Sequence, residues 1–180
     1  MLSLITFLPL LGTVLLYLFP NTRVQRWIAL GTSGLVLLIG IILAALFNWQ
    51  RGTLQFEEHA SWIPTLGSSY HLGVDGLSLP LILLTALLTL LAILHAWKQD
   101  KFPREYFALY LVMETGLLGF FSTMDLLLFY VFFEIALVPM YFIIGIWGHE
   151  GQRLQAALKF FLYTRVGSLA VLLSILGLYL

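Results

Sequence analysis

The 180-residue sequence contains no cysteine, which excludes disulfide bonds, iron–sulfur clusters, thiolate zinc sites and cysteine nucleophiles. Charged residues are also scarce, because Asp, Glu, Lys and Arg make up 10% of the chain, against about 25% in an ordinary soluble domain. Nine basic and nine acidic side chains give a formal net charge of zero, so no basic excess is available to hold a nucleic-acid backbone. A soluble globule and a nucleic-acid-binding protein are therefore both excluded.

Motifs of soluble enzymes are missing as well. The sequence has no phosphate-binding glycine loop, no metal-ligand spacing and no Ser/His/Asp arrangement. The segment GVDGLS, residues 73–78, is interpreted only as a helix start with Asp75 near its cap. No metal ion, no bound cofactor and no catalytic residue of the soluble type is expected on this chain.

Long hydrophobic runs are what the sequence has in abundance, and 61% of its residues are hydrophobic. A bilayer core about 30 Å thick requires roughly 20 apolar residues in a helix, because each residue advances the helix axis by about 1.5 Å. Backbone hydrogen bonds in lipid must be made within each segment, so runs of this length are predicted to be helices. The runs predict an all-α membrane protein with about six transmembrane helices, at residues 2–19, 27–47, 76–97, 106–123, 126–147 and 156–180.

One polar segment, residues 48–75, divides the chain into three predicted parts. Two transmembrane helices lie within residues 1–47, and four lie within residues 76–180. Inside the polar segment, the stretches LQFEEHASWIP and SYHLGV alternate loosely between apolar and polar residues, and the turn-forming TLGSS separates them. This pattern predicts a short external β-hairpin that lies on the membrane surface.

Basic residues are distributed unequally between the two sides of the predicted helices. Lys and Arg favour the cytoplasmic side of a membrane, so the richer side is predicted to be inside and the N-terminus outside. The richer side carries Arg23, Arg26, Lys98, Lys101, Arg104 and Arg153, and the other side carries Arg51.

Four charged residues lie inside predicted spans, where a charge is costly and therefore marks a functional candidate: Glu114, Glu134, Lys159 and Arg165. Glu114 precedes the turn near Asp125 by about as many residues as Glu134 follows it, so both carboxyls are expected roughly 14 Å below the outer surface. A carboxyl group poised between its charged and neutral forms can load and release a proton. Each acid also has a structural alternative: Glu134 as a neutral hydrogen-bonded link between helices, and Glu114 as part of a close helix contact at Gly116 and Gly119.

The remaining candidates have similar alternatives. Pro139 has no N–H for the carbonyl of Ile135, which either admits water next to Glu134 or only kinks the helix. Lys159 either extends back to the inner surface or pairs with an internal carboxylate. Arg165 hardly ever loses its proton, so it serves only as a fixed charge or counter-ion. His95, near the inner end of the third helix, is either a hydrogen-bonded helix contact or a relay member.

Three stretches of the sequence resemble one family: GVDGLSLPLILLTALLTLLAI at residues 73–93, METGLLGFFSTMDLLLFYVFFEIALVPMYFIIGIWG at 113–148 and ALKFFLYTRVGSL at 157–169. They are similar to the antiporter-like M subunit (chain 4) of complex I, which is called NuoM in bacteria and NdhD in photosynthetic NDH-1. Residues 125–148 carry the most specific part of the match, whereas the first two helices match in pattern only.

The resemblance implies a proton-translocating membrane-arm subunit of NADH:quinone oxidoreductase, with the N-terminal part of a fold of about fourteen helices built from two inverted repeats. It implies that Glu134 is the key glutamate of the fifth helix, Lys159 the lysine of the sixth and Glu114 a fourth-helix acid. At Arg165 the family pattern more often has an uncharged residue. A broken seventh helix with its lysine and the whole second repeat would begin beyond Leu180, so this chain alone is not expected to pump protons or to oxidise NADH.

Cofactors and partners follow from the same resemblance. None is implied on this chain, while NADH, quinone, FMN and iron–sulfur clusters are implied in other subunits, and the partners are the neighbouring membrane-arm subunits and the lipid bilayer. The membrane is expected to be the bacterial plasma membrane or, alternatively, the thylakoid membrane. Two other functions stay open: a subunit of a multisubunit cation/proton antiporter, and a purely structural membrane scaffold in which neutralising Glu134 changes nothing.

The charge asymmetry generates a test of orientation. Cysteines introduced one at a time at Thr65 and Lys101 are expected to react with a membrane-impermeant thiol reagent from opposite sides, because the two positions flank a predicted span of residues 76–97. Position 65 is expected to react from outside, and position 101 is expected to react only after the membrane is permeabilised. Labelling of both positions from one side would contradict the topology.

Overall fold

The computed structural model describes the backbone of residues 1–179 and, except at positions 66 and 179, their side chains. The sixth predicted helix runs to Leu180, and this last residue lies outside the described residues. The described residues form six α-helices and a two-stranded antiparallel sheet: α1 (Leu2–Leu18), α2 (Thr22–Leu46), β1 (Gln55–Ile63), β2 (Ser68–Val74), α3 (Ser78–His95), α4 (Pro103–Ser122), α5 (Leu126–Trp147) and α6 (Arg153–Tyr179).

The predicted all-α membrane fold with a hairpin is confirmed, and the differences lie at helix starts. Three helices, α2, α4 and α6, begin three to five residues before the predicted runs, at Thr22, Pro103 and Arg153. The prediction begins each helix at its apolar stretch, but a helix extends through polar residues to its cap. At α2 the side chain of Asn21 accepts from the backbone N–H of Arg23, and at α4 Pro103 occupies the first turn, where proline is favoured.

Among the described residues, four helices are long and apolar enough to cross a membrane by themselves: Thr22–Leu46, Ser78–Lys98, Leu126–Trp147 and Arg153–Leu178. The other two are α1, which has 17 residues, and α4, which carries Arg104, Glu105 and Glu114. Protein surrounds α4 on several sides, because it packs against α1, α2, α3 and α5. Its polar residues can therefore be shielded from lipid by neighbouring helices.

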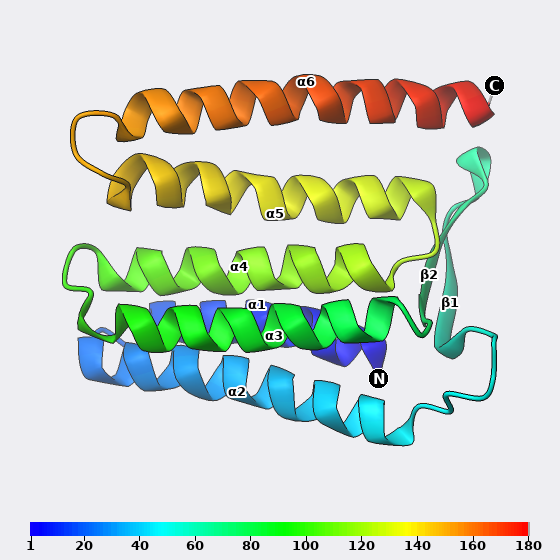
Figure 1. The fold of residues 1–180 in the computed structure, drawn as a ribbon, viewed down its shortest axis with the longest axis horizontal. Coiled ribbons are helices and arrows are strands. Elements are labelled where there is room, and N and C mark those ends of the chain that lie inside the picture. The colour runs from blue at the N-terminus through cyan, green and yellow to red at the C-terminus, as the bar shows by residue number, and fades with distance from the viewer. Residues whose placement is uncertain (180) are drawn as a thin grey trace.

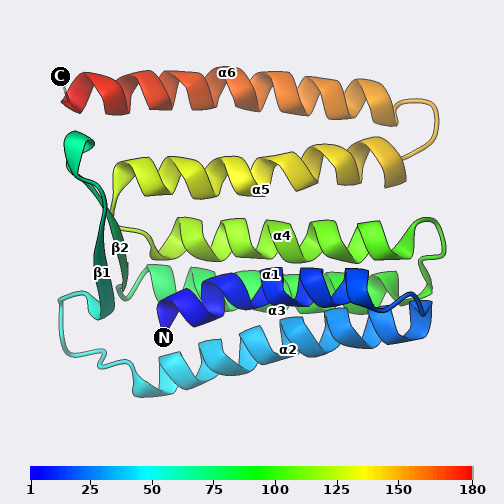
Figure 2. The same ribbon diagram turned by 180° about the vertical axis from the view of Figure 1, so that it is seen from behind.

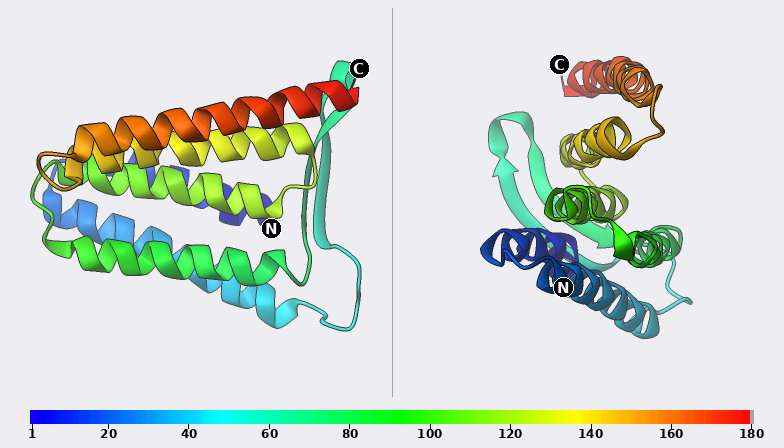
Figure 3. Two further views of the ribbon diagram at one scale, coloured as in Figure 1. Left: turned by 45° about the horizontal axis from the view of Figure 1, so that its top comes forward. Right: turned by 90° about the vertical axis from the view of Figure 1, so that its left-hand side faces the viewer.

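All six helices run side by side, and the hairpin crosses one end of them (Figures 1 and 2). The helices α1 to α4 form a cluster, α5 packs on α4, and α6 packs on α5 at the edge of the bundle (Figure 3). We call the end where α1, α3 and α5 begin the hairpin end, and the end that holds the connections 19–21, 96–102 and 148–152 the loop end. The six basic residues predicted to share one side all lie at the loop end.

The hairpin is fastened to the helices through carboxylates. Glu58 on β1 accepts hydrogen bonds from the backbone N–H groups of Leu2 (2.8 Å) and Ser3 (3.0 Å) and from the N-terminal ammonium group. Partial burial raises the pKa of Glu58, but the bonds from the ammonium group and Ser3 outweigh this effect and hold the pKa at about 2. Asp75, just after β2, accepts from the N–H of Ser78 at 2.7 Å. Acidic groups at these positions stabilise helix N-termini.

The contact between α4 and α5 is close at two glycines of α4. A Cβ atom added at Gly116 would lie 2.6 Å from the backbone nitrogen of Ala136, and one added at Gly119 would overlap the ring of Phe132. The predicted close contact at these two glycines is therefore confirmed. It brings α5 close enough to α4 for backbone to pack against backbone.

The first structural test concerns this contact. Replacing Gly116 by Ala is expected to destabilise the protein by about 1–3 kcal/mol, because the added methyl group meets backbone that must move. The matched control is Gly31→Ala in α2, where nothing lies within 4 Å of the added atom. There the loss of chain flexibility is expected to stabilise by about 0.5–1 kcal/mol. If the melting temperature of Gly116→Ala in detergent rises as that of Gly31→Ala does, the contact is unimportant.

Candidate functional site

Asp125 sets the start of α5. Its Oδ1 atom accepts from the backbone N–H groups of Leu127 (2.9 Å) and Leu128 (3.0 Å), which makes it the N-cap of the helix. The same carboxylate accepts from the hydroxyl of Ser68 and the N–H of Ser69 in the hairpin, both at 2.9 Å. Partial burial raises the pKa of Asp125, but the four donors outweigh that effect and leave the pKa below its usual value. One side chain thus joins the hairpin to α5.

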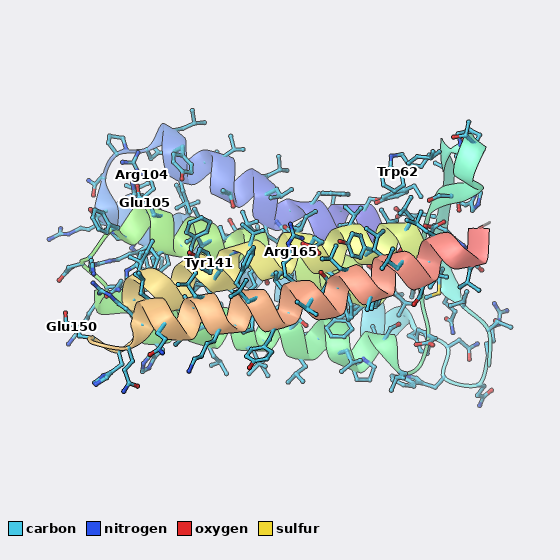
Figure 4. The ribbon with its side chains drawn as sticks, turned by 90° about the horizontal axis from the view of Figure 1, so that it is seen from above. Trp62, Arg104, Glu105, Tyr141, Glu150 and Arg165 are labelled. Carbon is cyan, nitrogen blue, oxygen red and sulfur yellow. The ribbon has the colours of Figure 1, made fainter. Side chains whose placement is uncertain are left out.

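Glu134 lies eight residues after the first residue of α5, which places it about 12 Å along the helix from the hairpin end. Its side chain is 17% exposed and forms an ion pair with Arg165 of α6, whose Nη1 donates to Oε2 of the carboxylate. The guanidinium is 43% exposed. In Figure 4, Arg165 lies near the middle of α6, far from Glu150 at the loop end. The pair therefore sits deep within the length of the bundle.

This ion pair lines an open cavity of about 620 Å³. Arg165 and Glu134 are the charged groups in its lining, and Tyr130 is the one further titratable side chain there among the described residues. The other lining side chains are apolar and come from α4 and α5: Leu109, Val112, Val131, Ile135, Val138, Pro139 and Phe142.

Two polar acceptors in this region are short of donors: a backbone carbonyl without its usual helical donor and a side-chain oxygen without a partner. Pro139, inside α5, has no N–H for the carbonyl oxygen of Ile135, and both residues line the cavity. The Oε1 atom of Glu134 is buried and has no hydrogen-bond partner among the described residues. A buried acceptor without a donor is costly, and a water molecule or a bound proton would remove that cost.

Glu114 occupies a different environment. Its side chain is fully buried, at 0% exposure, and neither carboxyl oxygen has a hydrogen-bond partner among the described residues. Gly116 and Gly119 mark the face of α4 that touches α5, and Glu114 projects from the opposite face, because two residues turn a helix by about 200°. Glu114 and Glu134 are each eight residues from the hairpin end of their helix, but the backbone of α4 separates them.

Lys159 and Arg165 project from different faces of α6. Lys159 is exposed and lies six residues before Arg165, about 9 Å closer to the loop end and roughly 120° around the helix. Its neighbours on the outer face, Tyr163 and Val166, are also exposed. Among the described residues Glu134 pairs with Arg165 and not with Lys159. His95 is exposed at the last turn of α3 and forms no part of the cavity.

The partnership of Glu134 and Arg165 is not among the sequence-based predictions, although a signal for it exists. Glu134 lies 13 residues before Trp147, the last residue of α5, and Arg165 lies 12 residues after Arg153, the first residue of α6. Antiparallel helices joined by a short loop place such residues at equal depth. A depth counted only from the hairpin end of α5 does not reveal this match. The described residues hold no group of three or more His, Asp and Glu side chains suited to a metal ion.

Comparison with known proteins finds one matching family and several relatives. Residues 123–180 match the family described as "NADH:quinone oxidoreductase/Mrp antiporter, TM". The F(420)H(2) dehydrogenase subunit M of Methanosarcina mazei is 40% identical over 180 residues, which cover 98% of this chain and 36% of that protein. The NADH-quinone oxidoreductase subunit M of Rhodobacter capsulatus is 40% identical over 186 residues, which cover 100% of this chain and 36% of that protein.

A solved structure shows the same similarity. Respiratory complex I from Thermus thermophilus with bound NADH contains a chain that aligns with a TM-score of 0.82 and 34% identity, over 98% of this chain and 35% of that chain. The resemblance to the M subunit that the sequence indicated is therefore confirmed. The chain spans about a third of the length of the curated relatives it matches.

The cap at Asp125 generates a test. Asp125→Ala is expected to destabilise by about 1–2 kcal/mol, because α5 loses its N-cap and the hairpin loses its acceptor. Asp125→Asn keeps an oxygen for the cap and is the matched control, with a smaller loss. The folded-state pKa is lowered, so the stabilisation by Asp125 is present above its unfolded pKa of about 3.9 and disappears as the pH falls through the folded value. Equal unfolding curves for both variants would refute the cap.

Proposed function

We propose that this chain is the N-terminal part of a proton-translocating membrane-arm subunit of a complex I type enzyme, NADH:quinone oxidoreductase or NDH-1. In this proposal electron transfer elsewhere in the complex drives protons through the subunit. The observation that carries the proposal is Glu134, a carboxylate held deep in the bundle by the cation Arg165, inside a cavity with a free buried oxygen. The similarity to proteins named NADH-quinone oxidoreductase subunit M supports it.

The chemistry of the cavity suits proton transfer. Its free acceptors, Oε1 of Glu134 and the carbonyl oxygen of Ile135, can hold water, and water chains conduct protons between ionisable groups. A carboxylate that can accept and release a proton is the active group, and Arg165 stays charged throughout.

Two further residues have proposed roles in the same process. Glu114, in the core formed by α1 to α4, is a second proton carrier, separated from Glu134 by α4. Lys159 lies on the outer face of α6, where a further part of the subunit would pack, and it transfers protons in that direction. Residues 1–47 then form two supporting helices, residues 48–75 the external hairpin, and residues 76–180 the start of the first antiporter-like repeat.

The proposal places the redox chemistry in other subunits. The two relatives compared above are named for different electron donors, F420H2 and NADH, and both are 40% identical to this chain. A chain that matches both equally well is suited to the step that the two enzymes share. NADH, quinone, FMN and iron–sulfur clusters would therefore be bound by other subunits, and this chain alone would neither pump nor oxidise NADH. The N-terminus would face the outside of a bacterial plasma membrane, or the corresponding side of a thylakoid membrane.

A cation/proton antiporter subunit is the second candidate, because the matched family description includes Mrp antiporters. The names of the two relatives compared, both subunits M of redox enzymes, favour the oxidoreductase. Dependence of transport on quinone reduction would distinguish the two activities.

The proposal is tested by Glu134→Gln in the complete complex, reconstituted in vesicles with a pH-sensitive dye. Glutamine keeps the size and hydrogen bonding of the side chain but cannot titrate, so proton translocation is expected to fall at least about tenfold while the complex still assembles. The matched control is Glu150→Gln at the exposed loop end, for which normal pumping is expected. Normal pumping by Glu134→Gln would remove this residue from the mechanism and favour a structural scaffold.

A further inference from the structure

The hairpin carries a pair of histidines that the proposed function does not use. His59 on β1 lies directly across from His71 on β2 in the antiparallel register. Their ring centroids are 5.2 Å apart, and the ring planes meet at 68°. We propose that this pair binds a divalent transition-metal ion such as Zn²⁺, with water completing the coordination. The inference does not depend on the proposed function of Glu134.

The two faces of the hairpin have different surroundings. Side chains alternate along a strand, so Glu58 and His59 point to opposite faces. Glu58 faces the bundle, where it accepts from the backbone N–H groups of Leu2 and Ser3. His59 therefore lies on the face away from these helices and is exposed, and its cross-strand partner His71 shares that face. A metal ion can reach the pair from water.

The separation of the two rings fits coordination of one shared ion. Imidazole binds Zn²⁺ at a Zn–N distance of about 2.0–2.1 Å with tetrahedral angles, which places the centroids of two ligating rings about 5 Å apart. The rings of His59 and His71 already have this separation, so the strands need not separate for both to bind. Imidazole suits Zn²⁺, Ni²⁺ and Cu²⁺, whereas Mg²⁺ takes oxygen ligands. Because the described residues hold no group of three such ligands, water fills the remaining positions and binding is reversible.

Glu57 orients one of the two rings. Nε2 of His71 lies 3.0 Å from Oε2 of Glu57. An ionised carboxylate only accepts hydrogen bonds, so Nε2 donates and the lone pair of the neutral imidazole is on Nδ1. A carboxylate on the other nitrogen of a ligating histidine fixes the ring and makes it a stronger ligand. His71 thus has the arrangement of a metal ligand, with Nδ1 as the ligating atom.

The strand register, and not the sequence spacing, creates this pair. His59 and His71 are twelve positions apart, so the spacing motif of a metal site is missing although the rings are neighbours. An ion between them links β1 to β2. The carbonyl oxygen of His71 also accepts from the N–H of Met124 at 2.9 Å, in the connection before α5. A ligand that binds only the folded state makes opening rarer, so the ion stabilises the hairpin where it joins the helices.

The experiment measures hydrogen exchange of the hairpin amides, residues 55–74, in the complete complex with and without Zn²⁺. At a free Zn²⁺ concentration about ten times the dissociation constant obtained by titration, exchange is expected to slow about tenfold, because opening becomes rarer by that factor. Mg²⁺ at the same concentration is expected to leave exchange unchanged. The matched control is His149→Gln, which removes an exposed histidine at the loop end and is expected to keep the full protection.

Variants of the site separate binding by the pair from binding elsewhere. His59→Gln is expected to lose the protection by Zn²⁺. Glu57→Ala is expected to weaken binding about 10–100-fold, because His71 loses the acceptor that orients its ring. The ratio of exchange rates with and without Zn²⁺ is taken within each variant, which cancels any effect of the substitution on the hairpin itself. Protection that survives in His59→Gln, or no protection in the unmodified complex, would overturn the proposal.

Discussion

The constraint on which this structure depends is that the interior of a lipid bilayer supplies neither hydrogen-bond partners nor counter-charges. Every charged group inside the bundle must therefore be compensated by the protein itself or stay neutral. Glu134 and Arg165 meet this condition by pairing across the α5–α6 contact. Glu114 has no cation and no hydrogen bond among the described residues. The two acids thus differ in character although they lie at equal depth.

Helix ends impose a second requirement, which explains the arrangement at the hairpin end. Helices α1, α3 and α5 all begin there, and each leaves backbone N–H groups without partners inside the helix. The carboxylates of Glu58, Asp75 and Asp125 accept hydrogen bonds from these groups. Glu58 lies on β1 of the hairpin, and Asp75 directly follows β2. The hairpin therefore covers the bundle and also completes its helices. Through Asp125 it is bound to the helix that carries Glu134.

At the loop end the corresponding requirement is met by cations. The carbonyl oxygen of Ile146, near the C-terminus of α5, accepts from Lys101 at 3.1 Å and from Arg153 at 3.2 Å. The residues that the sequence assigned to one side by counting charges therefore also satisfy a helix C-terminus, where cations interact favourably with the helix dipole. The indole of Trp147 donates to the carbonyl of Lys101 at 2.7 Å and joins the loop before α4 to the end of α5.

The sequence by itself determined the helices, the hairpin and the depth of each charged residue, because these depend on apolar run length and on a fixed rise per residue. It also indicated the close contact at Gly116 and Gly119. Only the tertiary structure decided which residues face one another. Glu114 and Glu134 match in depth but lie on opposite sides of α4. Lys159 and Arg165 share a helix, but only Arg165 contacts Glu134. A helix that is apolar on nearly every side has no distinct polar face, so its sequence does not state which side a neighbour will cover. That is settled by how the helices pack, here by the glycine contact of α4 with α5 and by the way α6 lies on α5.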